Sequence, residues 1–104
     1  MKIAINDCFG GFGVTKAVFK ELGIEYDGYG YLDNDSFGIK SSNYNEYRKH
    51  PKLISAIEKI GVEDSSGSCA KICIVDIPED VEWEINDYDG AESIHEVHRS
   101  WWKV

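Results

Sequence analysis

The sequence has no long apolar run and few cysteines, and each shortage excludes a class of protein. No apolar stretch approaches the roughly 20 residues that a membrane span requires, so we predict no membrane association. The opening residues, MKIAINDCFGG, carry one lysine, a short apolar stretch and no small-residue cleavage site, so no secretory signal is predicted. Three cysteines in 104 residues favour free thiols in a reducing compartment, and therefore a cytoplasmic location.

Basic residues are scarce, with 11 lysines and arginines against 19 aspartates and glutamates. Proteins that coat nucleic acid use lysine and arginine to replace phosphate counterions, so this balance argues against bulk nucleic-acid binding. Between Asp76 and His98 the shortage is complete, because this segment holds nine carboxylates and no lysine or arginine. Such a segment is typical of a solvated face, but it also suits imitation of a polyanion or docking on a basic partner.

The residues that are present predict a single α+β domain, residues 1–104, with a small, mostly antiparallel sheet and two to three helices. Alternation predicts strands over residues 2–7 and 70–77, and helical spacing predicts helices from Val14 to Leu22 and from Pro51 to Ile60. Gly23 and Gly61 are expected to end these helices, and Thr15 lies where it could cap the first one.

The remaining segments have weaker signals. We expect a hairpin or an irregular excursion over residues 24–43, an extended segment over 44–48, because His50 precedes Pro51, and a polar turn over 64–68. Strand 70–77 is expected to return through residues 78–80 as strand 81–85, with Val81, Trp83 and Ile85 inward and Glu82 and Glu84 outward. A short helix is expected from Ala91 to Arg99.

A glycine-rich turn, Cys8-Phe9-Gly10-Gly11-Phe12-Gly13, lies between the first strand and the first helix. Backbone N–H groups in such a turn, together with a helix N-terminus, favour phosphate oxygens. The turn matches neither the dinucleotide-binding fingerprint nor a P-loop. The alternative is that these glycines serve backbone geometry only.

Catalysis and metal binding have little support. Cys8 lies before a helix, where a thiolate is stabilised, and His50, His95 or His98 could serve as its base, but an inert buried thiol is the favoured interpretation. Cys69 and Cys73 on one strand would be about 13 Å apart, too far to share a zinc ion with His95 and His98. We therefore predict no catalytic residue, no metal and no cofactor.

Aromatic and arginine side chains offer the chemistry of a purine site, since rings stack on bases and guanidinium groups bind phosphates. Phe9 and Phe12 flank the glycines, and Trp101 and Trp102 follow Arg99. The same residue types also build cores and dimer interfaces. Because adjacent tryptophans cannot both face one way, at least one of them is expected to cover a neighbouring chain or a groove.

Three stretches resemble a family of short, mostly uncharacterised proteins of tailed bacteriophages: N-D-C-F-G-G-F-G (Asn6 to Gly13), R-K-H-P-K-L-I (Arg48 to Ile54), and I-V-D-I-P-E-D-V-E-W-E-I-N-D-Y-D-G with H-R-S-W (Ile74 to Trp101). Together they cover about half of the chain. Relatives often carry a basic residue in place of Asp7 and an acidic one in place of His50.

The resemblance implies a non-enzymatic anti-defence protein in the host cytoplasm. One such group looks like nucleotide sponges, homo-oligomers that sequester a cyclic oligonucleotide or a cyclised ADP-ribose product. The residues that would suit such a ligand are Phe9, Gly10, Gly11, Phe12, Gly13, Arg48, Arg99, Trp101 and Trp102. An acidic inhibitor or polyanion mimic acting on a host enzyme is the alternative, followed by a small enzyme using Cys8 or a histidine. A virion or assembly component stays open as well.

Overall fold

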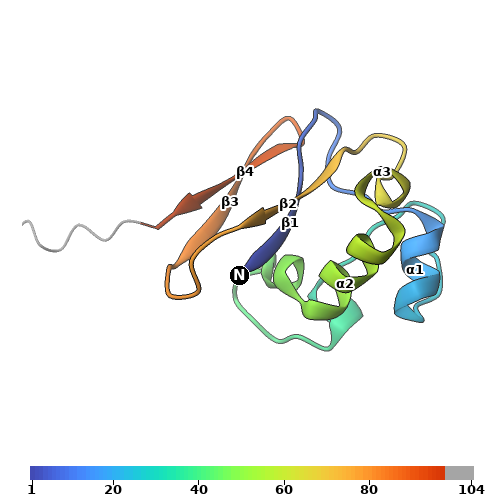
Figure 1. Ribbon diagram of the computed structural model, residues 1–104, viewed down its shortest axis with the longest axis horizontal. Helices are drawn as coiled ribbons and strands as arrows, with labels where there is room; N and C mark the ends of the chain where they lie inside the picture. Colours follow the sequence, from blue (N-terminus) through green and yellow to red (C-terminus); the bar gives the residue numbers. More distant parts are fainter. Residues whose placement is uncertain (98–104) are drawn as a thin grey trace, which may run out of the picture.

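Two antiparallel two-stranded sheets form the centre and one end of the molecule (Figure 1). The computed structural model describes residues 1–97. Strand β1 (Lys2–Asn6) pairs with β2 (Ile72–Asp76), with Ile3 opposite Val75 and Ile5 opposite Cys73. Strand β3 (Trp83–Tyr88) pairs with β4 (Ala91–Glu96) to form the β3–β4 hairpin.

Helices gather at the other end of the molecule (Figure 1). They are α1 (Lys16–Leu22), α2 (Pro51–Ile60) and α3 (Val62–Ser65), with 3-10 helices η1 (Asn34–Phe37) and η2 (Glu46–Lys49). Helix α2 begins as its sequence predicts, because Pro51 occupies the first helical position and Nδ1 of His50 accepts a hydrogen bond from the Lys52 N–H at 3.1 Å. No helix within residues 1–97 has the length and apolar character needed to cross a membrane.

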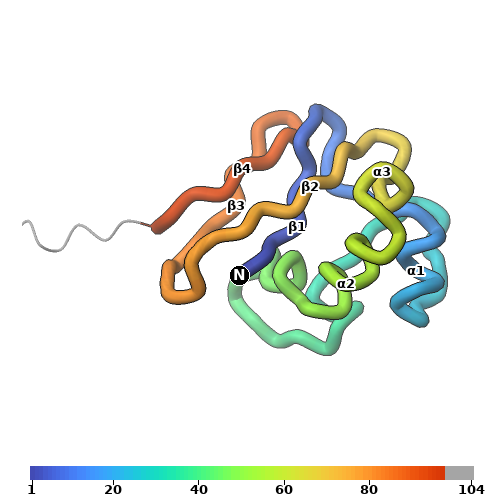
Figure 2. The backbone as a smooth tube through the Cα atoms, in the orientation of Figure 1, coloured from blue at the N-terminus to red at the C-terminus, as the bar shows by residue number. Residues whose placement is uncertain are grey.

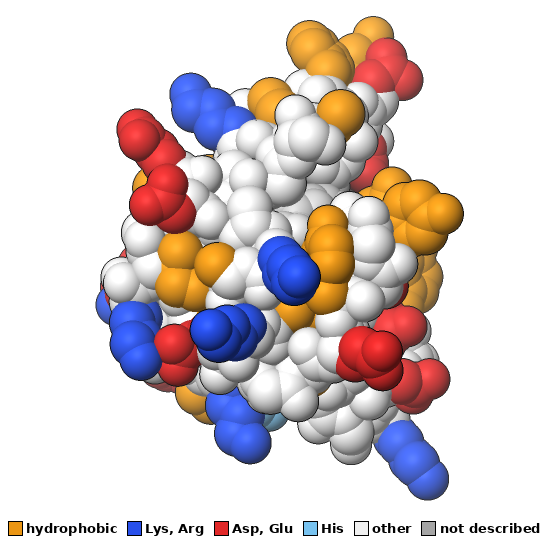
Figure 3. Space-filling model, turned by 90° about the vertical axis from the view of Figure 1, so that its right-hand side faces the viewer, with side chains coloured by type: hydrophobic (Ala, Val, Ile, Leu, Met, Phe, Trp, Pro, Cys, Tyr) orange, Lys and Arg blue, Asp and Glu red, His pale blue; other side chains and the backbone are white. Residues whose placement is uncertain are grey.

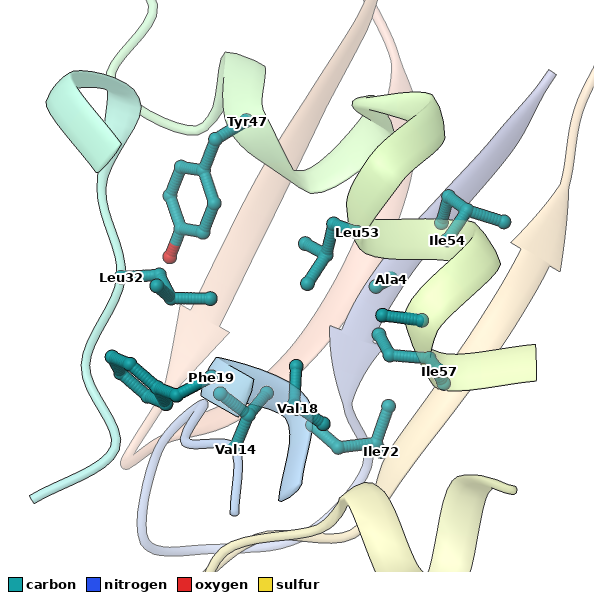
Figure 4. Packing of buried hydrophobic residues seen from close by; sticks show 11 residues of the cluster. Ala4, Val14, Val18, Phe19, Leu32, Tyr47, Leu53, Ile54, Ile57 and Ile72 are labelled. Atoms are coloured by element: carbon teal, nitrogen blue, oxygen red, sulfur yellow. The ribbon is translucent and has the colours of Figure 1, made fainter. Parts of the chain in front are cut away.

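The main core lies between the helices and one face of the β1–β2 sheet (Figure 4). Leu53 and Ile57 of α2 pack with Val18 of α1 and with Ala4 and Ile72 of the sheet, and all five are buried. Side chains alternate along a strand, so Ile3 and Ile5 point to the opposite face, where they are also buried. Strand β1 is therefore covered on both faces.

The predicted α+β class is confirmed, as are the strand at the N-terminus, the strand that becomes β2 and the helix between Pro51 and Gly61. Residues 24–43 take the irregular alternative, with η1 as their only regular element. Helix α1 begins at Lys16, because Thr15 is its N-cap residue and remains extended.

The predicted pairing of strand 70–77 with strand 81–85 is wrong. Strand β2 pairs with β1, and β3 pairs with β4 instead. Asp89 and Gly90 link β3 to β4 with positive φ values of 51° and 91°, as a type I′ hairpin turn requires. The Asp89-Gly90 pair is a strong local hairpin signal, and it fixes the partner of β3. The predicted alternation of Val81, Trp83 and Ile85 with exposed residues is confirmed.

The predicted helix from Ala91 to Arg99 is also wrong, since Ala91–Glu96 form β4. Ala91 and Ile94 are three residues apart, which fits a helix, but Glu92 and Ile94 share the inward face of a strand. Residues 98–99 of that prediction lie outside the described part of the chain.

Two shorter predictions need correction. Residues 46–49 form η2 rather than an extended segment, because proline restricts only the residue before it, and His50 alone is extended (φ −61°, ψ 130°). The Asn43 side chain starts the preceding turn by accepting a hydrogen bond from the Asn45 N–H at 3.0 Å. Part of the predicted polar turn at 64–68 belongs to α3.

Candidate functional site

The glycine turn, residues 8–13, packs against two other turns of the chain (Figure 2). Gly10, with φ of 126°, lies so close to the Cys69 carbonyl group that a side chain would collide with it. Gly90 of the β3–β4 turn lies against the main chain of Gly10 and Gly11, again without room for a Cβ atom. Close approach of backbones therefore accounts for Gly10 and Gly90.

Main-chain groups of the glycine turn, which was predicted to bind an anion, already form hydrogen bonds within the protein. The Gly10 N–H donates to the Asp89 carbonyl at 3.1 Å, and the Gly13 carbonyl accepts from the Gly67 N–H at 2.9 Å. The turn thus holds the β3–β4 hairpin on one side and the chain before β2 on the other.

A buried ion pair joins Arg48 of η2 to Glu92 of β4. Nη1 of Arg48 lies 2.7 Å from Oε1 of Glu92 and Nη2 lies 2.9 Å from Oε2, so the contact is bidentate. Each side chain is 5% exposed. The Phe12 ring lies 3.7 Å below the guanidinium carbon, and the Tyr47 ring covers it at 5.2 Å. Burial is the largest single influence and lowers the pKa of Arg48, but the hydrogen bonds and charges of Glu92 and Tyr47 together leave the pKa raised.

The ion pair occupies the place of a third strand beside β1. Main-chain groups of alternate residues point to the same strand edge, and Ala4 and Asn6 point away from β2. The Ala4 carbonyl accepts from Nη1 of Arg48 at 3.2 Å, and the Asn6 N–H donates to Oε1 of Glu92 at 2.8 Å. Two side chains therefore satisfy the strand edge that a neighbouring strand would otherwise bind.

Asn6 connects the same region to three further segments and is fully buried. Its Nδ2 group donates to the carbonyls of Cys8 and Gly90, each at 2.6 Å, and its Oδ1 atom accepts from the Lys71 N–H at 2.7 Å. A single amide side chain thus ties β1, the glycine turn, the hairpin turn and the start of β2 together.

Cys8 forms no hydrogen bond with a histidine among residues 1–97. The hydrogen-bond partners of its thiol are Asn6 and Cys69. His50 caps α2, and His95 lies on the exposed face of β4 with Nε2 3.0 Å from the Ser93 hydroxyl. Residues 1–97 also contain no group of three or more histidine, cysteine or acidic side chains placed to hold a metal ion.

The β3–β4 hairpin and the loop before it form a strongly acidic surface. Of the nine carboxylates from Asp76 to Glu96, Glu92 alone is buried. The first two, Asp76 and Glu79, form ion pairs with the terminal amino group at 3.1 Å and 3.7 Å. Among residues 1–97, no ion pair is formed by five exposed carboxylates, namely Asp80, Glu84, Asp87, Asp89 and Glu96, which we call the hairpin carboxylates.

The rest of the described chain is nearly balanced in charge. Residues 1–75 hold ten carboxylates and nine lysines and arginines, whereas residues 76–97 hold nine carboxylates and none of either basic residue. The helical end of the molecule accordingly shows lysines interspersed with carboxylates (Figure 3). The negative charge of the described residues is therefore concentrated at the opposite, hairpin end.

An open groove of about 840 Å³ lies between α2 and the end of the β1–β2 sheet. Its lysines already have partners, since Nζ of Lys2 lies 2.6 Å from Glu58 and Nζ of Lys49 lies 2.8 Å from Glu46. The groove also contains Asp76. These pairings leave it without the excess positive charge that a phosphate group requires.

The residues predicted to bind a nucleotide fall into four groups. Phe9 is 67% exposed and contacts Tyr88, which is 74% exposed, edge to face at 6.3 Å. Phe12 and Arg48 contact each other inside the protein. The three glycines Gly10, Gly11 and Gly13 form the packed turn described above. Arg99, Trp101 and Trp102 lie outside the described residues.

Asn6 and Glu92 were not predicted from the sequence as interacting residues. A signal for Glu92 exists once residues 91–96 are treated as a strand, because Glu92 then shares the inward face with Ile94. An inward carboxylate requires a buried partner, and this predicts a cation from elsewhere in the chain. Asn6 has no comparable local signal.

No family model, no curated protein and no solved structure matches this chain. The resemblance to tailed-bacteriophage proteins therefore stays a prediction.

Proposed function

We propose that this protein is a non-enzymatic binding protein that docks its acidic hairpin on a basic surface of another protein. The observation that carries the proposal is the set of five exposed hairpin carboxylates without an ion pair among residues 1–97. On an ordinary solvated face, acidic and basic side chains are interspersed, as they are at the helical end (Figure 3). Charge of one sign at one end instead steers a partner of opposite charge.

The hairpin is fixed to the body of the protein, which favours binding. The Arg48–Glu92 pair anchors β4, and the Asn6 and Gly10 hydrogen bonds anchor the hairpin turn. A surface that is already ordered loses less conformational freedom when it binds. The anchoring also explains why Glu92 faces inward while its acidic neighbours in sequence face solvent.

Nucleotide sequestration, which the sequence alone favoured, is the second candidate function. It requires a cation for phosphate, and the guanidinium of Arg48 is already bound to Glu92. The exposed Phe9–Tyr88 pair beside the glycine turn is the observation that still favours it, because exposed rings can stack on a base. Arg99, the remaining arginine of the sequence, would then have to supply the phosphate contact.

The acidic-docking proposal is tested by comparing two charge-reversed variants as bait in host-cell extract. The hairpin variant carries Asp80→Lys, Glu84→Lys and Glu96→Lys. The body variant carries the same number of reversals at other exposed carboxylates, Glu25→Lys, Asp35→Lys and Glu63→Lys. A specific partner is expected to be captured by the wild-type protein and the body variant and lost with the hairpin variant. A partner that both variants lose equally would indicate attraction by net charge only.

Thermal unfolding with cyclic oligonucleotides and ADP-ribose derivatives separates the second candidate from the first. A ligand at about 100 times its dissociation constant stabilises by about 2.7 kcal/mol, which corresponds to several degrees for a domain of this size. A selective shift that Phe9→Ala removes would favour sequestration. If no compound shifts the midpoint, the nucleotide candidate loses its support.

A further inference from the structure

Two of the three cysteines lie close together where the glycine turn meets the turn before β2. The Cys8 thiol is 3.5 Å from the main-chain carbonyl of Cys69 and 3.5 Å from Oδ1 of Asn6. The Cys8 sulfur therefore already contacts the main chain of Cys69. Cys69 is exposed and Cys8 is half-buried, so solutes can reach the pair.

The backbones of the two turns are held in this arrangement. The Asp7 N–H donates to the Lys71 carbonyl at 2.8 Å, which continues the β1–β2 ladder up to the turns. Gly10 lies directly against Cys69, without room for a Cβ atom. On this register Cys8 lies opposite Ala70, the neighbour of Cys69, and a disulfide requires Cα atoms about 4.4–6.8 Å apart.

The third cysteine, Cys73, differs from Cys8 and Cys69 in its position and in the reactivity of its thiol. Cys73 lies within β2 opposite Ile5, and Cys8 is three residues beyond Ile5, or roughly 10 Å along the strand. That separation is too large for a disulfide. Burial raises the pKa of the Cys73 thiol, which reduces its thiolate fraction and hence its reactivity. Cys73 is therefore an internal control for Cys8 and Cys69.

We propose that Cys8 and Cys69 are a redox modification site that closes to an intramolecular disulfide when a hydroperoxide is present. One thiolate attacks the peroxide, becomes a sulfenic acid and releases water. The second thiolate then attacks the sulfenic sulfur, the S–S bond forms, and a second water leaves. The two thiols are oxidised by two electrons in total, and one hydrogen peroxide is reduced to two waters.

The bond would join the glycine turn to the chain before β2 and restrict the unfolded chain over the whole segment between the two cysteines. The oxidised protein is therefore expected to unfold at a temperature higher by roughly 5 °C or more. Because the glycine turn also contacts the hairpin turn, oxidation would stiffen the support of the acidic hairpin.

In the test, the protein of residues 1–104 is treated with hydrogen peroxide, and disulfides are mapped by mass spectrometry of unreduced peptides. The wild-type protein and Cys73→Ser are expected to yield a Cys8–Cys69 peptide, with the loss of two hydrogen atoms from the intact chain. Cys8→Ser and Cys69→Ser are expected not to yield it. Mapping in the wild-type protein decides the question even if a serine variant does not fold.

Three results would overturn the proposal. They are a disulfide that includes Cys73, a bond formed only between separate chains, and sulfenic or sulfinic acid on Cys69 without any bond to Cys8. None of these results bears on the acidic-docking proposal, which the charge-reversed variants test separately.

Discussion

At the scale of single residues, the Arg48–Glu92 pair is a buried contact that, together with the Asn6 hydrogen bonds, holds the two sheets against each other. It satisfies the free edge of β1, orients β4 and removes the arginine from solvent. A buried pair of this kind adds little net stability compared with apolar residues, but removing one partner leaves an uncompensated charge. Its role is therefore to fix the position of the hairpin.

Replacing one partner is expected to be costly. Arg48→Met leaves the Glu92 carboxylate buried without a cation, and we expect a loss of about 3–5 kcal/mol in the free energy of unfolding by urea. The double variant Arg48→Met, Glu92→Gln is expected to recover a large part of this loss, since the glutamine is neutral and still accepts from Asn6. Lys49→Met, which removes an exposed ion pair with Glu46, is the control at about 0–1 kcal/mol. Equal losses for Arg48→Met and Lys49→Met would contradict this role.

At the scale of elements, helices and strands were predicted correctly where residues close together in the sequence determine them. Pro51 and Gly61 delimit α2, and alternating isoleucines mark β1, because in both cases the residues that decide the structure are neighbours in sequence. The pairing of β1 with β2 could not be predicted in this way, since its two strands are more than 60 residues apart.

The β3–β4 pairing and the burial of Arg48 were not predicted, for different reasons. Residues 91–96 combine helical spacing of two apolar positions with strand alternation, and the Asp89–Gly90 turn signal decides between them. The burial of Arg48 depends on Glu92, which lies 44 residues away, so no local pattern distinguishes it from a phosphate-binding arginine. Arg48 could therefore be recognised as the partner of Glu92, and not as a phosphate ligand, only from the fold.

A further prediction at this scale concerns the turn over residues 27–31. The Asp27 carboxylate accepts hydrogen bonds from the N–H groups of Gly30, Tyr29 and Tyr31 at 2.6, 2.8 and 3.2 Å. These bonds, the one from Gly30 most of all, hold the pKa of Asp27 below its ordinary value. A carboxyl group whose pKa is lowered by folding stabilises the fold above its unfolded pKa of about 4, and this contribution is lost as the pH falls through the folded pKa.

Comparison with Asp27→Asn tests this contribution. The difference in unfolding free energy between the two proteins is expected to be constant above about pH 5 and to shrink below about pH 4. Urea unfolding at a series of pH values from neutral to acidic measures it. A difference that stays constant over the whole series would show that the carboxylate charge is not what holds the turn.

At the scale of the whole molecule, charge separation is the property most relevant to function. The helical end carries both signs (Figure 3). Residues 76–97, which include the hairpin, carry nine carboxylates and no lysine or arginine. Such a distribution accelerates association with a basic surface, and the acceleration falls as salt is added.

The dissociation constant of a captured partner, measured at low and at physiological salt, tests the docking of the acidic hairpin most directly. The measurement compares the hairpin variant with the body variant, each of which has three carboxylates replaced by lysine. If the hairpin is the docking surface, its reversal weakens binding about tenfold or more and reduces the salt dependence, while the body reversal changes either quantity far less. If both reversals weaken binding equally, or if the hairpin reversal has no effect, the hairpin is not the docking surface.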